Sequence, residues 1–282
     1  SVTMSLKLTR NMPPFEGVAA SQTATCRLPI GLTFHQVYVL LGNTAAGPGP
    51  EEIDIDEIRV VANGETIQRI AGGAVLDSYN QFDGRAAFPA AGTAGYLTID
   101  FDRYALRTRA GEELTAVGTG MADDPNPVTT LTLEIDINSG ATSPTLSAVA
   151  RQSVPQQLGL IKKLRTFNYS AGGAGDLEIS TLPKGDLINR IFFGESANNT
   201  TNLRIERDNF TVFQRSATLN SLIQNDGIRV SQSGYYVYDP TETGDGAEGL
   251  VTQGVNDLRF ILTTDGAIDY TVGVEYIGTI DI

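Results

Sequence analysis

Hydrophobic and polar residues alternate with a period of two in many short segments of the chain. Residues 131–137 read LTLEIDI, with leucine and isoleucine at every second position and polar residues between them. Residues 96–101 read YLTIDF and place Leu97, Ile99 and Phe101 on one side. A β-strand with one buried face has this period. The pattern therefore predicts a protein made mainly of short strands.

The last part of the chain contains two such segments close together. Residues 258–262 read LRFIL and residues 269–277 read DYTVGVEYI. We expect them to form a hairpin, with Asp265 and Gly266 supplying the positive φ that a tight hairpin turn requires.

Helical patterns are few. Residues 74–79 (AVLDSY) and 217–223 (ATLNSLI) each predict one short helix. Residues 143–165 could hold another helix, but Pro155 would break it, because proline lacks the amide hydrogen that a helix interior needs.

Four short motifs occur twice along the chain, in the same order. They are Leu-Pro-x-Gly at 28–31 and 182–185, Gln-Arg at 68–69 and 214–215, Asp-Gly at 83–84 and 226–227, and Gly-Tyr at 95–96 and 234–235. The same frame carries the alternating residues 131–137 onto residues 270–276. The two predicted helices also occupy matching places. This regularity indicates an internal duplication that covers most of the chain.

The duplication divides the 282 residues into two similar domains. We assign residues 1–140 to the first domain with its N-terminal arm, residues 141–158 to a linker, and residues 159–282 to the second domain. Short strands, glycine-rich turns and little helix favour an all-β fold of two tandem eight-stranded jelly-roll β-sandwiches. The repeated Leu-Pro-x-Gly is then the same corner in both sandwiches, where proline ends strand pairing and glycine permits a bend.

Composition excludes several classes of function. A net charge of −13 argues against wrapping nucleic acid, which favours basic surfaces. Cys26 is the single cysteine, so no intrachain disulfide is possible, and we expect it to be a small buried residue. Apolar runs such as residues 37–41 are too short to span a bilayer, and the N-terminal segment has no apolar core of a signal peptide.

Histidine occurs once, as His35 in a predicted strand. A serine or cysteine triad would have to use it, and a structural zinc site cannot be built from one histidine and one cysteine. Its counterpart in the second copy is Asn189, so we interpret the position as merely polar. We expect no catalytic and no cofactor-binding residues.

Two acidic clusters are the remaining candidates for ligand binding. Residues 51–57 (EEIDIDE) and 239–249 (DPTETGDGAEG) offer carboxylate oxygens, which calcium prefers. Neither has the spacing of an EF-hand loop. Asp54 and Asp56 alternate with isoleucines, as on the solvated face of a strand. Calcium is possible, no cofactor is required, and the metal ligands stay unknown. A carboxylate pair for glycoside hydrolysis is conceivable, but no pair is singled out.

Two further segments have structural rather than chemical interpretations. The glycine-rich residues 171–176 (AGGAGD) precede a strand-like run and not a helix, so we expect a loop and not a phosphate site. The aromatic residues 234–238 (GYYVY) match GYLTI in the first copy, which indicates a shared strand rather than a glycan platform.

Several segments resemble the major capsid protein of the corticoviruses, which are membrane-containing icosahedral bacteriophages. They are LPIG after SQTATCR, residues 144–154 (PTLSAVARQSV), LPKGDLINRI, and the elements NDLRF and VGVEYIG near the C-terminus. These elements cover nearly the whole chain in the same order. The chain departs from the family pattern in the loops at residues 43–56 and 240–249.

The resemblance implies a double jelly roll and a viral major capsid protein. It implies homotrimers of pseudo-hexagonal outline that meet neighbouring trimers in an icosahedral shell around an internal membrane and genome. Partners would include other virion proteins and the membrane, without sequence-specific nucleic acid binding. The protein would reside in the virion, and in the host cytoplasm before assembly. Calcium supports particle stability in that family.

Two alternatives stay open at this point. One is a tandem β-sandwich that binds glycans, as in an adhesin or spike, and the other is a β-sandwich hydrolase that acts through carboxylates. Residues 1–11 and 141–155 carry few core signals, so we expect them to pack against neighbouring subunits or the inner surface of a shell.

Overall fold

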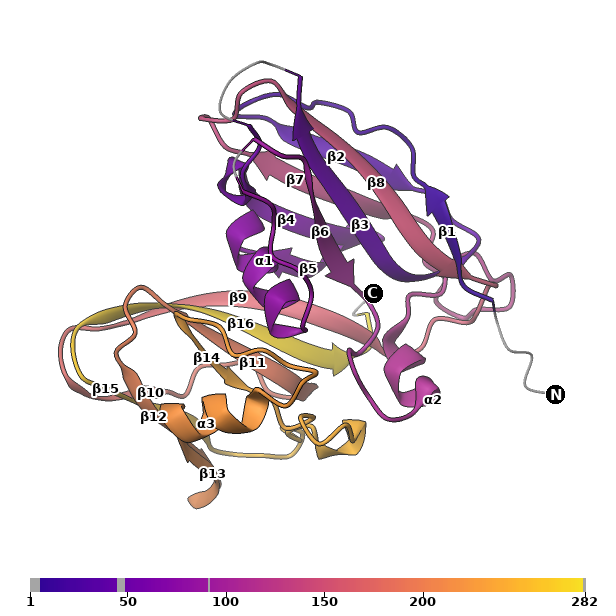
Figure 1. Ribbon diagram of the computed structural model, residues 1–282. Coiled ribbons are helices and arrows are strands. Elements are labelled where there is room, and N and C mark those ends of the chain that lie inside the picture. Colours follow the sequence, from indigo (N-terminus) through magenta and orange to yellow (C-terminus); the bar gives the residue numbers. More distant parts are fainter. Residues whose placement is uncertain (1–5, 45–48, 91, 281–282) are drawn as a thin grey trace. The chain divides into compact units, whose positions relative to one another are not determined.

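Strands dominate the structure, as the alternating pattern predicts (Figure 1). The computed structural model describes residues 6–44, 49–90 and 92–280. The chain forms two units. The first comprises residues 1–80, 85–164 and 278–282, and the second comprises residues 81–84 and 165–277.

Two four-stranded antiparallel layers make up the first unit. One layer has the order β1-β8-β3-β6, and the other has the order β5-β4-β7-β2. The strands are β1 (Leu8–Asn11), β2 (Thr23–Leu28), β3 (Thr33–Asn43), β4 (Ile55–Ala62), β5 (Glu65–Ile70), β6 (Gly95–Asp100), β7 (Leu131–Ile137) and β8 (Pro144–Ser153).

The second unit repeats this arrangement with the next eight strands. Its layers have the orders β9-β16-β11-β14 and β10-β15-β12-β13, which are the first unit's orders with eight added to each strand number. The strands are β9 (Ile161–Ala171), β10 (Gly175–Ile179), β11 (Leu187–Glu195), β12 (Thr200–Arg207), β13 (Phe210–Ser216), β14 (Tyr235–Tyr238), β15 (Leu258–Thr264) and β16 (Ile268–Gly278). This strand order confirms both the duplication and the prediction of two eight-stranded jelly rolls.

Both predicted short helices are present. They are α1 (Gly73–Phe82) and α3 (Ala217–Gln224), and each follows the strand that carries the Gln-Arg motif. The remaining helices are single turns: η1 (Glu52–Asp54), α2 (Arg109–Glu112), η2 (Glu113–Thr115) and η3 (Gly246–Glu248). Among the residues that the structure describes, no helix is long and apolar enough to cross a membrane.

Each unit has its apolar core between its two layers. In β7 the apolar positions are buried and the polar positions between them are half-exposed, as the alternation predicts. In the second unit Phe193, Phe260 and Val272 belong to one buried cluster drawn from both layers. Each such side chain contributes about 1.5–3 kcal/mol when fully buried. Burial of alternating residues therefore holds the layers together.

The predicted hairpin at the end of the chain is wrong. β15 and β16 are consecutive, but they lie in different layers of the second unit. Gly266 in the connection does not have a positive φ, so no tight hairpin turn forms. In a jelly roll the chain crosses repeatedly between layers, and the short distance along the sequence does not make these strands partners.

The match of residues 131–137 with residues 270–276 is also wrong. β7 occupies the position that β15, and not β16, takes in the second unit. Any two alternating strands can be superimposed in phase, because the period of two is common to all of them. The pairing order removes this ambiguity and makes β8 the counterpart of β16.

The proposed linker contains a strand and no helix. Residues Pro144–Ser153 form β8, which pairs with both β1 and β3 inside the first unit. The buried residues of β8 are Ala148, Ala150, Gln152 and Ser153, so its buried side carries a weak hydrophobic signal. The connection between β8 and β9 comprises only residues 154–160, and Pro155 lies within it.

Candidate functional site

The repeated Leu-Pro-x-Gly motif forms the same corner in both units. Gly31 and Gly185 both have φ of +123°, a region that glycine adopts without strain. The amide of Gly31 donates to Thr119 Oγ1 at 2.9 Å, and the amide of Gly185 donates to Thr252 Oγ1 at 2.8 Å. Each threonine hydroxyl donates to the carbonyl of the residue after the glycine, at 2.6 Å in both units. The sequence motif did not reveal these threonines, which come from distant loops.

A second duplicated contact fixes each helix to a strand. Asn80 at the end of α1 donates to the carbonyl of Thr98 at 2.9 Å and accepts from its amide at 2.8 Å. Gln224 at the end of α3 donates to the carbonyl of Val237 at 2.9 Å. Both side chains are buried. The helices are thus tied to β6 and β14 by equivalent polar side chains.

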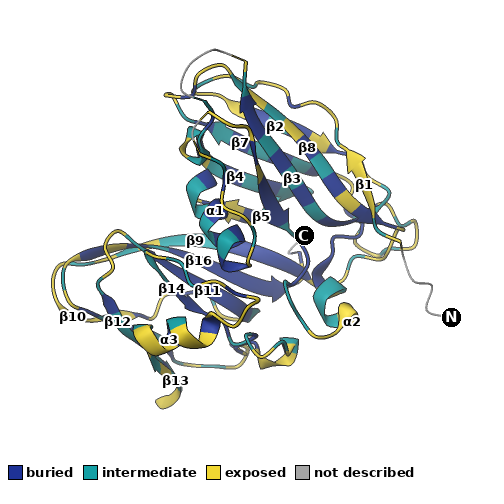
Figure 2. Cartoon of the chain, viewed as in Figure 1, coloured by how far each residue is buried: buried dark blue, intermediate teal, exposed yellow. Residues whose placement is uncertain are grey.

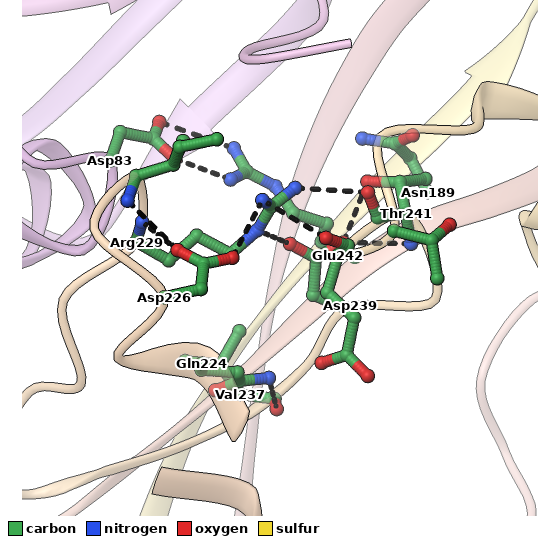
Figure 3. A network of polar contacts seen from close by, with 12 residues as sticks. Asp83, Asn189, Gln224, Asp226, Arg229, Val237, Asp239, Thr241 and Glu242 are labelled. Carbon is green, nitrogen blue, oxygen red and sulfur yellow. Dashed lines mark hydrogen bonds and ion pairs between the residues drawn. The ribbon is translucent and has the colours of Figure 1, made fainter. Parts of the chain in front are cut away.

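A third duplicated contact is an ion pair after each Asp-Gly motif. The two Nη atoms of Arg85 bind the carboxylate of Asp100 at 2.7 and 2.9 Å. Arg229 Nε binds Asp239 Oδ2 at 2.6 Å, and both side chains are almost fully buried (Figure 3). These contacts are architectural, because each joins the loop after a helix to the end of a strand.

The second unit also contains a buried charge network around Arg190. Its Nε and Nη2 atoms each donate to Glu275 at 2.9 Å, and Nη1 donates to Asp83. Asn189, which is labelled in Figure 3, donates to Glu275 at 2.9 Å and extends the network. Burial opposes the charge on Arg190, but the two carboxylates outweigh it and raise the pKa of the guanidinium well above its usual value. The arginine is therefore charged at any ordinary pH.

Residues 81–84, at the end of α1, belong to the second unit. Phe82 packs edge-on against Phe192, with ring centroids 5.5 Å apart and an interplanar angle of 85°. The guanidinium of Arg190 lies over both rings, 5.8 Å from Phe82 and 5.2 Å from Phe192. The sequence identified Asp83 only as part of the repeated Asp-Gly motif and did not reveal its ion pair with Arg190.

His35 is buried between an acid and a hydroxyl in the first unit. Its Nδ1 lies 2.9 Å from Asp102 Oδ1, and its Nε2 lies 2.8 Å from Ser153 Oγ. An imidazole protonated at Nδ1 donates to Asp102 and accepts from Ser153. Lys7 Nζ also donates to Asp102, at 3.1 Å. The hydrogen-bonded series Ser153–His35–Asp102 has the residue types of a hydrolytic triad.

The surroundings of His35 favour the structural interpretation. His35, Asp102 and Ser153 are 0%, 2% and 4% exposed, so a substrate cannot reach the hydroxyl. In the second unit the counterpart Asn189 binds Glu275 in a similarly enclosed place. The position is polar in both units and pairs with a carboxylate in both.

Carboxylates of the first acidic cluster bind partners within the chain. Asp54 accepts from the amide of Glu51 at 3.0 Å, Glu57 pairs with Arg59, and Asp56 accepts from Asn138 at 2.8 Å. The second cluster is similar: Asp239 binds Arg229, Glu242 pairs with Arg215 at 2.9 Å, and Asp245 caps η3. Within residues 6–44, 49–90 and 92–280, no group of three or more His, Cys, Asp or Glu residues is placed to hold a metal ion. The metal ligands thus stay unassigned.

Three smaller predictions are confirmed. Cys26 is fully buried, donates to the carbonyl of Pro13 at 3.2 Å, and has a pKa that burial raises to about 11. Of the predicted loop at residues 171–176, residues 172–174 connect the strands, whereas Ala171 ends β9 and Gly175 begins β10. The aromatic residues of GYYVY form β14.

Models of viral coat protein P2 match nearly the whole chain. The model of its N-terminal domain matches residues 9–153, and the model of its C-terminal domain matches residues 161–280. No curated protein sequence matches the chain.

Solved structures of viral capsid proteins share the fold. The chain is similar to the major capsid protein P2 from bacteriophage PM2, with a TM-score of 0.82 and 22% identity over 97% of each chain. It is similar to a chain in the structure of Sulfolobus turreted icosahedral virus, with a TM-score of 0.69 and 12% identity over 96% of this chain and 90% of that one. For the Faustovirus major capsid protein the values are 0.63 and 7%, over 99% and 90%. At these identities the likeness establishes the tandem jelly-roll fold.

Proposed function

The chain belongs to the viral coat protein P2 family and is a viral major capsid protein of the virion shell; on this premise we propose that it assembles as a homotrimer of pseudo-hexagonal outline. Membership of this family favours the capsid function over the glycan-binding alternative. Self-association is inherent in a coat protein, whereas the number of chains per capsomer is our proposal.

The observation that carries this proposal is the equivalence of the two units. Both have eight strands in the same order of layers, and both repeat the glycine corner, the helix anchor and the arginine–aspartate pair. Three such chains present six similar wedges, so a three-fold assembly can fill a six-sided place in a closed lattice. Closed rotational symmetry is the usual solution for identical chains.

The other parts of the proposal concern partners and chemistry. Trimers meet neighbouring trimers in an icosahedral shell around a membrane and genome, and they contact other virion proteins. The chain resides in the host cytoplasm before assembly and performs no catalysis. The enclosure of Ser153 supports the last point, because its hydroxyl is inaccessible to a substrate.

Native mass spectrometry over a concentration series tests the trimer. We expect a dominant species of three chains and, by negative-stain electron microscopy, particles with a six-sided outline. A chain that stays monomeric at high concentration would contradict the proposal.

A further inference from the structure

Helix α3 has its polar and apolar faces reversed relative to a surface helix. Leu219, Leu222 and Ile223 lie on one face and are exposed, Leu222 by 72%. Asn220 and Gln224 face inward and are buried. Figure 2 shows α3 and the neighbouring β13 as largely exposed. An exposed apolar face of this kind indicates a surface that a partner covers.

The contact that α1 makes through its end indicates what the end of α3 could contact. On β11 of the second unit, Arg190 and Phe192 are covered by Asp83 and Phe82; Phe82 is the last residue of α1 and Asp83 follows it. Because α1 and α3 are counterparts, the Asp-Gly motif after α3 makes Asp226 the counterpart of Asp83. The side chain of Asp226 is 29% exposed.

Strand register identifies the matching surface on the first unit. Arg190 on β11 lies opposite Glu275 on β16, and Gln36 on β3 lies opposite Arg151 on β8. Gln36 therefore takes the place of Arg190, and Arg151 takes the place of Glu275. The basic residue of the pair is on β11 in the second unit, but in the first unit it is on β8, the counterpart of β16.

This surface is open and basic in the first unit. The side chain of Arg151 is exposed and makes no hydrogen bond or ion pair with any residue that the structure describes. A pocket of about 580 Å³ opens beside it and is also lined by Lys7, Arg107 and Arg109 and by Glu112 and Glu113. Lys7 and Arg109 pair with Glu113, so Arg107 and Arg151 are the cations of this lining that can meet a partner's carboxylate. In the second unit the end of a helix fills the equivalent place.

We propose that the apolar face of α3 and the Asp-Gly turn after it dock on the first unit of a second copy of this chain, with Asp226 against Arg151 of that copy. The contact reproduces between chains the covering of Arg190 by Asp83. Charge complementarity supports the occupant, since the Asp226 carboxylate, which lies 3.6 Å from Arg229 Nη1 of its own chain, meets the exposed Arg151 and Arg107 beside it. The contact is head-to-tail, so three copies can close a ring. The inference rests on the proposed trimer and assigns its interface.

Charge reversal tests the assigned pair. We expect Asp226→Arg and Arg151→Asp each to raise the concentration at which half of the trimer dissociates by roughly tenfold or more. We expect the double variant to recover most of this loss, because the pair is restored with opposite polarity. Asp265→Arg is the matched control, since Asp265 is also exposed but lies in the loop between β15 and β16. It should leave the trimer unchanged.

Asp226 also accepts hydrogen bonds from the amides of Ile228 and Arg229, so Asp226→Arg can disturb folding. Leu222→Asp is the second variant, because Leu222 is exposed and should tolerate a charge in the folded monomer. We expect it to dissociate the trimer without lowering the thermal midpoint of the monomer.

The outcomes separate the two proposals. If the wild-type chain is trimeric and both Leu222→Asp and Arg151→Asp keep the wild-type dissociation curve, the assigned interface is overturned and the trimer stands. If the wild-type chain forms no trimer, the proposed function fails, and this inference fails with it.

Discussion

At the scale of single residues, the strongest interactions in this protein are buried and polar. Arg190 is enclosed with Asp83 and Glu275, and His35 is enclosed with Asp102 and Ser153. Each group has partners, as buried polar groups require. These residues stabilise the sandwiches and offer no open site for a reaction.

Replacement of Arg190 by methionine should strongly destabilise the second unit. It would leave the buried carboxylates of Asp83 and Glu275 without a counter-charge, which typically costs about 3–5 kcal/mol in the free energy of unfolding. Urea unfolding followed by circular dichroism measures this. The matched control is Arg109→Met, which removes an exposed arginine from Glu113, a carboxylate that keeps Lys7 as a partner, and should change the unfolding curve very little. Equal effects of the two variants would contradict the assignment.

Cys26 should react slowly with thiol reagents while the protein is folded. Its pKa of about 11 leaves roughly 0.1% thiolate at pH 8, about a hundredfold less than an unperturbed thiol, and burial blocks access as well. Iodoacetamide labelling with and without urea measures the difference. Rapid labelling of the folded chain would contradict the burial.

The raised pKa makes the contribution of Cys26 to the free energy of unfolding depend on pH. Because the folded pKa is raised, this contribution is complete below the unfolded pKa of 9.0 and is lost as the pH rises toward about 11. Between pH 9 and about 11, the free energy of unfolding of a Cys26→Ala variant, measured by urea unfolding, should fall less steeply than that of the wild type.

At the scale of elements, β1 is the exposed edge of the first unit. All four of its residues are exposed, and it pairs only with β8 within the described part of the chain. Lys7 precedes it and binds Asp102 and Glu113 at 3.1 and 3.0 Å. Residues 1–5 of the predicted N-terminal arm lie outside the described residues. An exposed edge strand offers unpaired backbone groups to a neighbour.

Removal of residues 1–11 should impair assembly more than folding. The truncation removes an edge strand with no buried side chain, but it also removes Lys7 from Asp102, which keeps His35 as a partner, so we expect a moderate fall in the thermal midpoint. Particle or capsomer yield, measured by sedimentation, should fall much further. Equal losses of folding and assembly would contradict this expectation.

At the scale of the whole molecule, the contacts of the two acidic clusters indicate whether one chain needs calcium to fold. Several carboxylates of both clusters already have partners within the chain, for example Glu57 with Arg59 and Glu242 with Arg215. We propose that the single chain folds without calcium, and that any stabilising effect of the ion arises in the assembled particle.

Removal of calcium with EDTA should distinguish an effect on the single chain from an effect on the assembled particle. We expect EDTA to shift the thermal midpoint of the isolated protein by less than about 1 °C. Intact particles would dissociate or lose thermal stability if calcium bridges subunits. A large shift for the isolated protein would place a calcium site within one chain.

Periodicity and repetition by themselves determined the class of fold. Alternation in segments such as residues 131–137 depends on local geometry, because neighbouring side chains of a strand point to opposite faces. The order of the repeated motifs indicated two sandwiches, and the paired glycine corners have the same φ. The resemblance to the corticovirus capsid proteins was carried by the order of short segments.

Only the tertiary structure decided which strands are partners and which charges meet. A period of two shows which face of a strand is buried, but it is equally compatible with every neighbouring strand, so β15 and β16 looked like a hairpin and β7 looked like the counterpart of β16. Likewise, Asp83 and Arg190 are far apart in the sequence, and no local pattern brings them together. Pairing and ion-pair formation depend on contacts between distant segments, which exist only once the chain has folded.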